Sequence, residues 1–376
     1  MRISDAENLD SSESGSECEQ WLLYRGSLLL VIHLSVLSLT ANIVLVRAIL
    51  GASLIDNNVK WLLGNISLAS GIIALHSGLR SVVRIFQRCP SDVTSLHHRT
   101  WTDCSLEELI YTMSLLALAL SICFVGSERL SATMRKNYEE TDGCIGYVLA
   151  TISWFLSSAM ALVWLANTVT HDHPIEDTAH YCMHILIGPD ILFIGFLSVL
   201  LLVPAATVCV YGYLYWTTYT TMYQFGINLA APLDLGARFE IRCNLDFTRM
   251  MLPSVILHTC FCVLILPALY LVLKLVLDQH SPWTPITVNL IYSVNLIYSI
   301  SHCVIILYMS RSARRALNTF CSKRPVPANN SNNHLTVPGA PGGSEYPVVN
   351  FRRSPEDYNE MVTMLWNSID QEQESV

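Results

Sequence analysis

The sequence predicts an all-α membrane protein: a bundle of seven transmembrane helices with an extracellular N-terminus and a cytoplasmic C-terminus. Hydrophobic residues make up 52% of the 376 residues and charged residues only 14%, whereas a soluble domain carries about 25% charged residues. The few charges also gather between long apolar runs. This pattern is expected where lipid replaces water around the helices.

Seven apolar runs have the length that crosses a hydrocarbon layer of about 30 Å at 1.5 Å per residue. They cover residues 27–50, 61–83, 104–127, 145–169, 186–216, 250–277 and 285–309. In lipid every backbone N–H and C=O must bond within its own segment, so spans of this length are helical. Transmembrane β-strands need only about ten residues and show strict alternation, which these runs lack.

Basic residues predict the orientation. With the N-terminus outside, 15 of the 22 Lys and Arg residues fall on the cytoplasmic side, as the positive-inside rule requires. Arg80, Arg84, Arg88 and Arg99 lie near the first outer loop and weaken this bias. The chain has no long basic run, so it gives no support for nucleic-acid binding.

This topology divides the chain into four segments. Residues 1–26 are an extracellular N-terminal segment and residues 27–309 are the transmembrane domain. In 310–321, arginines alternate with apolar side chains, which predicts a short amphipathic helix along the inner leaflet, with membrane lipid as its partner. Its final residue, Cys321, is either an acylation site or a free thiol. Residues 322–376 form a cytoplasmic tail whose Pro-, Asn-, Gly- and Ser-rich first part suits disorder.

Two cysteines are placed to form a disulfide bond. Cys104 begins the third span at its outer end, and Cys182 lies in the outer loop before the fifth span. Both thiols would face the oxidising side of the membrane, where disulfides persist. Position and compartment therefore favour a Cys104–Cys182 disulfide over two unpaired cysteines among the 12. Cys18 and Cys89 are a second candidate pair on the same side.

A charged pair, Glu128-Arg129, lies at the inner end of the third span. Taken alone, the pair is explained by snorkelling, in which both charged heads reach the membrane interface. The helix between Cys104 and Arg129 is about 37 Å long, which is the hydrocarbon core plus part of both headgroup layers. Combined with Cys104 at this offset, the pair matches the third helix of seven-helix receptors, where it contacts the G-protein side.

The end of the third span also carries a family resemblance. The run Glu128–Thr133, ERLSAT, is followed by Tyr138-Glu139. It resembles the E-R-x-x-A-T…Y-E signature of nematode serpentine chemoreceptors of the Sra, Srab, Srb and Sre superfamily, and residues 61–69 and 238–244 also resemble these families. The resemblance covers most of residues 20–320. It implies a receptor for small chemicals, coupled to a heterotrimeric G protein, in the plasma or ciliary membrane of sensory neurons. We expect no enzymatic activity, no cofactor and no metal.

The chain departs from the larger rhodopsin-like class of receptors. The seventh span has no N-P-x-x-Y, the sixth has Pro267 without C-W-x-P, and the second has no Asp at mid-membrane depth. The sodium site and the switch details of that class are therefore not carried over.

A ladder of basic residues marks the outer half of the second span. His76, Arg80, Arg84 and Arg88 recur every four residues, so neighbours lie near one helix face. One hypothesis is that Arg80, together with His76, contacts an acidic ligand. The alternative is that Arg80 pairs with an acid at the top of the third span, while Arg84 and Arg88 lie in water. The available acids are Asp103, Glu107 and Glu108. We favour pairing, because ionisable groups inside the membrane normally find protein partners.

Three tyrosines are further candidates for contact with a ligand. Tyr111, Tyr270 and Tyr292 fall in the outer thirds of the third, sixth and seventh spans. Aromatic side chains there line ligand cavities or form the aromatic belt at the membrane interface. For any one of them we favour the belt or a packing role.

Two other function classes compete with the receptor. The run His171-Asp172-His173 resembles a metal pair and suggests a metal-dependent membrane hydrolase, but the chain has no H-E-x-x-H, G-x-S-x-G or C-x-x-C motif. A channel or transporter usually shows ionisable residues in several spans or inverted repeats. The later spans of this chain are nearly free of such residues.

Overall fold

The structure is a computed structural model, and nearly all of the residues it describes are helical. These are residues 4–52, 55–86, 101–134, 144–170, 190–227, 235–273 and 283–321. The helices are α1 (Ser4–Gly51), α2 (Asn57–Ile85), α3 (Trp101–Met134), α4 (Cys144–Thr170), α6 (Asp190–Ile227), α7 (Leu235–Cys260), the π-helix η2 (Phe261–Ile265), α8 (Leu266–Leu271), α9 (Thr284–Met309) and α10 (Arg311–Cys321).

Seven helical stretches within these residues are long and apolar enough to cross a membrane, which confirms the predicted number of spans. They are Trp21–Gly51, Asn57–Ile85, Glu107–Thr133, Cys144–Ala166, Leu197–Thr221, Asn244–Leu271 and Thr284–Met309. Several helices extend beyond the predicted spans; α7, for example, begins at Leu235 rather than near residue 250. Hydropathy marks where the lipid-soluble stretch ends, whereas a helix continues through polar residues until its backbone turns.

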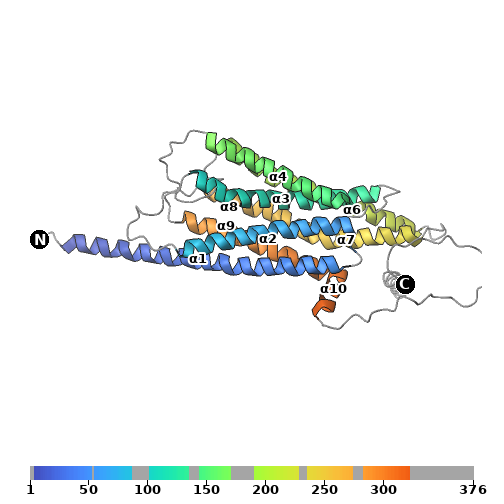
Figure 1. Cartoon of the computed structure of the whole chain (residues 1–376), viewed down its shortest axis with the longest axis horizontal. Helices are drawn as coiled ribbons and strands as arrows, with labels where there is room; N and C mark the ends of the chain where they lie inside the picture. The colour runs from blue at the N-terminus through green and yellow to red at the C-terminus, as the bar shows by residue number, and fades with distance from the viewer. Residues whose placement is uncertain are drawn as a thin grey trace, which may run out of the picture.

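The long helices lie side by side in one elongated bundle (Figure 1). α1 packs against α2 and α9, while α3 contacts α2, α4, α6 and α7 and so occupies the centre. We call the end at which α1 ends and α2 begins the Asp56 end, and the end at which α2 ends and α3 begins the Glu107 end. Each long helix runs from one of these ends toward the other. A residue near the start or the end of a helix therefore lies near one of the two named ends.

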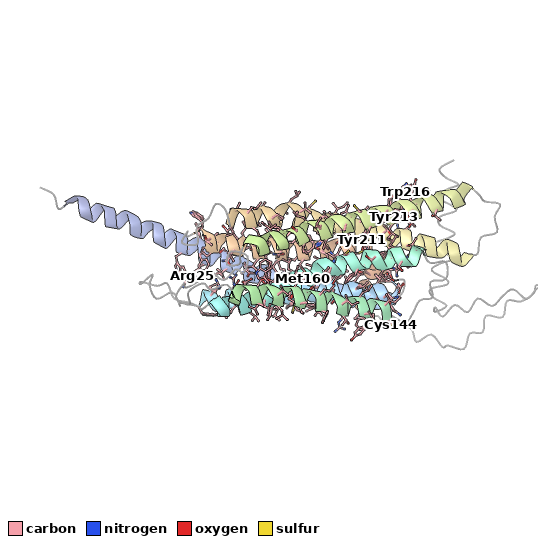
Figure 2. All side chains as sticks on the ribbon, turned by 90° about the horizontal axis from the view of Figure 1, so that it is seen from above. Arg25, Cys144, Met160, Tyr211, Tyr213 and Trp216 are labelled. Carbon is pink, nitrogen blue, oxygen red and sulfur yellow. The ribbon has the colours of Figure 1, made fainter. Side chains whose placement is uncertain are left out.

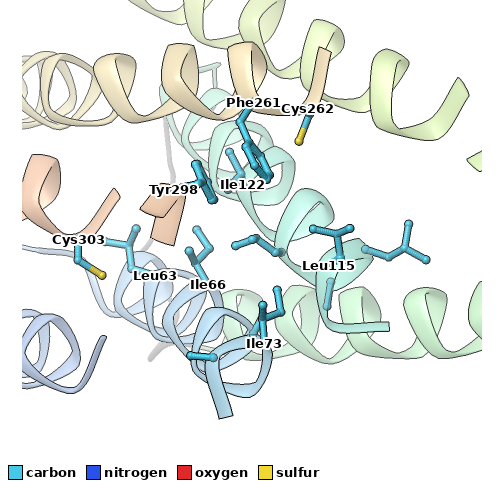
Figure 3. Packing of buried hydrophobic residues seen from close by; sticks show 14 of the residues in the cluster. Leu63, Ile66, Ile73, Leu115, Ile122, Phe261, Cys262, Tyr298 and Cys303 are labelled. Atoms are coloured by element: carbon cyan, nitrogen blue, oxygen red, sulfur yellow. The ribbon is translucent and has the colours of Figure 1, made fainter. Parts of the chain in front are cut away.

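The core is apolar and lies between α2, α3, α7, η2 and α9 (Figure 3). Leu63 and Ile66 of α2 face Ile122 of α3, and beside them the rings of Phe261 and Tyr298 stack with centroids 4.7 Å apart and planes 10° apart. This stack joins η2 to α9. The core thereby holds the sixth and seventh spans together next to the central helix.

Many large apolar side chains lie exposed on the surface of the bundle. On α6, Tyr211 is fully buried, whereas Tyr213 is 47% exposed and Trp216 is 64% exposed (Figure 2). Phe155 on α4 is 72% exposed and Leu202 on α6 is 69% exposed. A soluble monomer rarely exposes large contiguous apolar patches. The arrangement therefore fits a multi-pass membrane protein whose surrounding solvent is lipid.

A π-helical segment interrupts the sixth span just before Pro267. Proline has no N–H to donate to the carbonyl of residue 263, and its ring crowds that carbonyl. The backbone opens into one wide turn over Phe261–Ile265, directly ahead of that proline. The sequence predicts that Pro253 and Pro267 break backbone hydrogen bonds. A π-helical turn of this kind is a recognised site of helix bending.

A short helix, α10, follows the last span at the Asp56 end and points away from the bundle axis (Figure 1). The Ser310 hydroxyl caps it by accepting from the Ala313 N–H at 3.1 Å. Ala313 is fully buried, while Arg311 and Arg314 are exposed. This agrees with the predicted amphipathic helix. Cys321 is its last residue, and its side chain lies outside the described part of the structure.

A buried asparagine joins three helices in the middle of the bundle. The Asn65 side chain donates to the hydroxyls of Ser121 at 2.7 Å and Ser153 at 3.0 Å. Its Oδ1 atom accepts from Trp154 Nε1 at 2.6 Å. The side-chain amide of Asn65 therefore links α2 to both α3 and α4.

Replacing Asn65 with alanine is expected to destabilise the bundle by about 1–3 kcal/mol, because the Trp154 N–H would be left without an acceptor in an apolar interior. The measurement is the midpoint of detergent-induced unfolding of the purified protein. Thr151→Ala on α4 is the control, since that side chain is exposed and bonds only to its own helix. Equal midpoints for the two variants would contradict the assigned role of Asn65.

Candidate functional site

Two clusters of buried polar side chains lie at opposite ends of the bundle. We call the group around Arg129, at the Asp56 end, the Arg129 cluster, and the group around Arg80, at the Glu107 end, the Arg80 cluster. Both contain charges that the membrane interior would expel unless protein groups surrounded them. Each cluster also connects helices that are distant in the sequence.

The Arg129 cluster is built around one guanidinium. Its Nε lies 2.5 Å from Glu128 Oε2, and its Nη2 lies 2.8 Å from Glu128 Oε1. The same Nη2 donates to a carboxylate oxygen of Asp56, in the connection between α1 and α2. On the other side, Nη1 lies 3.5 Å from Asn244 Oδ1, and the guanidinium lies 5.7 Å from the ring centre of Phe247; both are on α7. Arg129 thus links α3 to the first connection and to the sixth span.

Local structure explains why Asp56 is in place. It is the N-cap of α2, where its Oδ1 accepts from the Asn58 N–H at 2.9 Å, as acidic N-caps do. Its other carboxylate oxygen is then directed to Arg129. Asn58 Oδ1 accepts in turn from the Gly146 N–H at 3.0 Å, so the start of α4 joins the same network.

Glu128 and Arg129 do not extend out of the bundle, as freely snorkelling side chains would. Glu128 is 3% exposed and Arg129 is 8% exposed. The physical reason is the carboxylate of Asp56, which comes from a distant part of the sequence and supplies a partner inside the bundle. Tyr138 and Glu139, the remaining residues of the predicted motif, lie outside the described residues.

The Arg80 cluster pairs two arginines of α2 with two acids of α3. Arg80 Nε lies 2.9 Å from Glu107 Oε1 and 3.7 Å from Glu108 Oε1. Arg84 Nη2 lies 3.4 Å from the same Glu107 oxygen. The Arg80 guanidinium also lies 4.6 Å from the ring centre of Tyr292, whose hydroxyl donates to Glu108. The four charges therefore balance within the bundle.

This arrangement confirms the predicted pairing of Arg80 with Glu107 and Glu108. The side chain of Asp103 and all of Arg88 lie outside the described part of the structure. The expectation that Arg84 lies in water is wrong, because its side chain is only 11% exposed. Glu107, one turn above Tyr111, serves both arginines, and this shared acid keeps Arg84 inside.

The three candidate tyrosines meet in the same region and are almost fully buried. Tyr111 and Tyr292 contact edge to face, with centroids 4.8 Å apart and planes at 72°. Tyr270 lies beside Tyr111 and interacts with it electrostatically. For these tyrosines the packing role is confirmed, and a place in the interfacial belt is wrong. Position along the spans predicted that the three tyrosines lie near the same end of the bundle, but it did not show that they converge.

Two polar side chains complete the Arg80 cluster. His76 Nε2 lies 2.7 Å from the backbone carbonyl of Glu107, and the His76 ring centre lies 6.0 Å from that of Tyr111. Asn295 Nδ2 donates to the Tyr111 hydroxyl and, at 3.1 Å, to the backbone carbonyl of Ile291. Sequence reasoning missed Asn295, because an asparagine in an apolar span carries no signal of its partner.

Two further sequence predictions remain predictions. Cys104 lies in α3, but its side chain is not described, and Cys182 lies outside the described residues. The described residues hold no group of three or more His, Cys, Asp or Glu side chains placed to bind a metal ion. His171 and His173 lie outside the part of the chain that the structure describes.

Replacing Arg80 with glutamine is expected to destabilise the protein by about 3 kcal/mol, because Glu108, 2% exposed, would lose its guanidinium partner. Adding Glu108→Gln to this variant should restore most of the loss. The detergent-unfolding midpoint reports both effects. Arg25→Gln is the control, since Arg25 is an exposed arginine on α1 (Figure 2). If Glu108→Gln gave no rescue, the ion pair would not be the source of the effect.

Comparison with known proteins adds no relative: no protein-family model matches the chain, and no curated protein matches it.

Proposed function

We propose that this protein is a G-protein-coupled chemosensory receptor, with its N-terminus outside the cell and its C-terminus in the cytosol. In this proposal a small molecule binds at the Arg80 cluster, and a heterotrimeric G protein binds at the Asp56 end. The protein lies in the plasma membrane, which in a sensory neuron includes the ciliary membrane. The proposal is supported by the resemblance at the end of α3 and by the seven apolar helices.

The observation that carries the proposal is the position of Arg129. One guanidinium joins the end of α3 to the first connection and to α7. The contact with α7 is the weakest of these, at 3.5 Å, and α7 continues into the wide turn of η2. A pivot at η2 would move the Asp56 end of α7 away from Arg129. Breaking this contact would open the face on which a G protein acts.

The Arg80 cluster supplies the other half of such a receptor. It joins α2, α3 and α9 through Arg80, Glu108, Tyr111 and Tyr292. Tyr270, on α8 just beyond η2, lies beside Tyr111 and interacts with it electrostatically. A ligand that shifts Tyr270 therefore acts on the segment that contains the wide turn. The two clusters are connected through the same span, and this connection is what coupling between two sites requires.

The test measures nucleotide exchange on purified Gα subunits of each class, with the full chain in lipid nanodiscs. Asn244→Ala removes the α7 contact of Arg129 and is expected to raise ligand-independent exchange by about 2- to 10-fold, the scale of a coupling of about 1 kcal/mol. Asn318→Ala, an exposed residue on α10, is the matched control. Exchange no faster than with empty nanodiscs, for wild type and variant with every Gα class, would refute the proposal.

A further inference from the structure

Two buried atoms of the Arg80 cluster, His76 Nδ1 and Asn295 Oδ1, have no hydrogen-bond partner. Each belongs to a side chain next to Tyr111, one through ring contact and the other through a hydrogen bond. An unsatisfied buried polar atom is costly and calls for an explanation.

The neighbouring hydrogen bonds limit the roles that these two atoms can have. His76 Nε2 faces a backbone carbonyl, which can only accept, so Nε2 carries the proton. In the neutral ring Nδ1 is then a lone pair. Asn295 Nδ2 likewise faces the carbonyl of Ile291, which fixes the amide orientation and leaves Oδ1 as an acceptor. Asn295 is 3% exposed, so bulk water does not satisfy it.

The charges of the Arg80 cluster set a condition on the charge of any ligand that binds there. Arg80 and Arg84 are matched by Glu107 and Glu108 at hydrogen-bond or ion-pair distance. A carboxylate ligand would have to displace one of these acids from its arginine, and an ammonium would add an unbalanced positive charge to a buried site. Both changes are expensive where the dielectric constant is low. A neutral ligand leaves the balance intact.

We infer that the ligand of the Arg80 cluster is a small neutral alcohol whose hydroxyl donates to one of the two unpaired acceptors, with its apolar part against the tyrosine rings. This inference rests on the proposed function, because it names the ligand class of the proposed receptor. A ketone of the same shape brings only an acceptor and leaves both protein acceptors unsatisfied. Sites built to bond a hydroxyl reject analogues that lack it.

The experiment compares four compounds that carry their polar group on the benzylic carbon of a phenylethyl unit: 1-phenylethanol, acetophenone, 1-phenylethylamine and 2-phenylpropanoate. Each is titrated against the purified full chain in nanodiscs, and the thermal unfolding midpoint reports binding. We expect 1-phenylethanol to half-saturate at a concentration at least about tenfold below those of the other three, the effect of about 1.4 kcal/mol from one satisfied acceptor. Equal half-saturation by the ketone would mean that ordered water satisfies the acceptors, and it would overturn the inference.

Three further results would contradict the inference that the ligand is an alcohol. Tighter binding of the amine or the acid, or no shift with the alcohol, would also overturn it. Asn295→Leu should abolish the alcohol preference, and His76→Phe provides a second test if the first variant does not fold. If both variants fold and both retain the preference, the site lies elsewhere and the inference fails.

The design separates this inference from the receptor proposal. Alcohol-selective stabilisation of a protein that drives no nucleotide exchange would support the ligand class and refute the receptor. Exchange that responds equally to alcohol and ketone would do the opposite.

Discussion

Replacing Arg129 with methionine is expected to lower the free energy of unfolding by about 3–5 kcal/mol, because two acids would remain buried without their cation. Glu128 is 3% exposed, and both of its oxygens bond to this guanidinium. The Asp56 side chain is 10% exposed and also depends on Arg129. The measurement is the midpoint of detergent-induced unfolding in a titration of the purified protein.

Second substitutions identify the source of this loss. Asp56→Asn keeps an oxygen that caps α2 but removes the charge, so adding it to the methionine variant should restore part of the stability. Adding Glu128→Gln as well should restore more. Arg311→Met, at an exposed arginine of α10, is the control and should change the midpoint little. If the neutral triple variant were as unstable as Arg129→Met alone, lost packing rather than charge would explain the effect.

The second large effect is expected at Gly146, where α4 approaches the start of α2. A Cβ atom on Gly146 would lie 2.2 Å from the Asn58 carbonyl oxygen and 2.6 Å from its Cα. These are backbone atoms, so no side-chain rotation can relieve the clash, and the helices must separate. Gly146→Ala is therefore expected to cost about 3 kcal/mol or more, and it should also weaken the hydrogen bond from the Gly146 N–H to Asn58.

Gly64→Ala is the matched control, because Gly64 is also helical and no atom lies within 4 Å of its added Cβ. Alanine there should be neutral or stabilising by about 0.5–1 kcal/mol, since it reduces the freedom of the unfolded chain. The two unfolding midpoints are compared under identical lipid conditions. If Gly146→Ala matched Gly64→Ala, the close approach of α4 to α2 would be wrong.

The number and approximate positions of the spans could be predicted because they depend on a local property. A run of about 20 apolar residues has one stable state in lipid, a helix that satisfies its own backbone. The amphipathic α10 followed from the same reasoning, since its arginines and Ala313 divide by face. Hydropathy failed only at the helix ends, such as Leu235, because polar residues continue a helix beyond the lipid.

The contacts within the Arg80 cluster, in contrast, depend on which helices pack against one another. Sequence spacing predicted that Arg80 lies near acids of the third span, and position along the spans predicted that Tyr111 and Tyr292 lie near the same end of the bundle. It could not show that Glu107 serves two arginines or that Asn295 bonds Tyr111. These contacts join residues separated by one or more whole helices.

The sequence by itself determined that this chain is a helical membrane protein with seven spans, because the transfer of apolar segments into lipid is decided segment by segment. Only the tertiary structure decided which charged side chains are buried. Arg129 is buried among protein groups because Asp56, from the connection before α2, provides a carboxylate inside the bundle. Whether a charge is buried depends on a partner in space, and local sequence does not specify that partner.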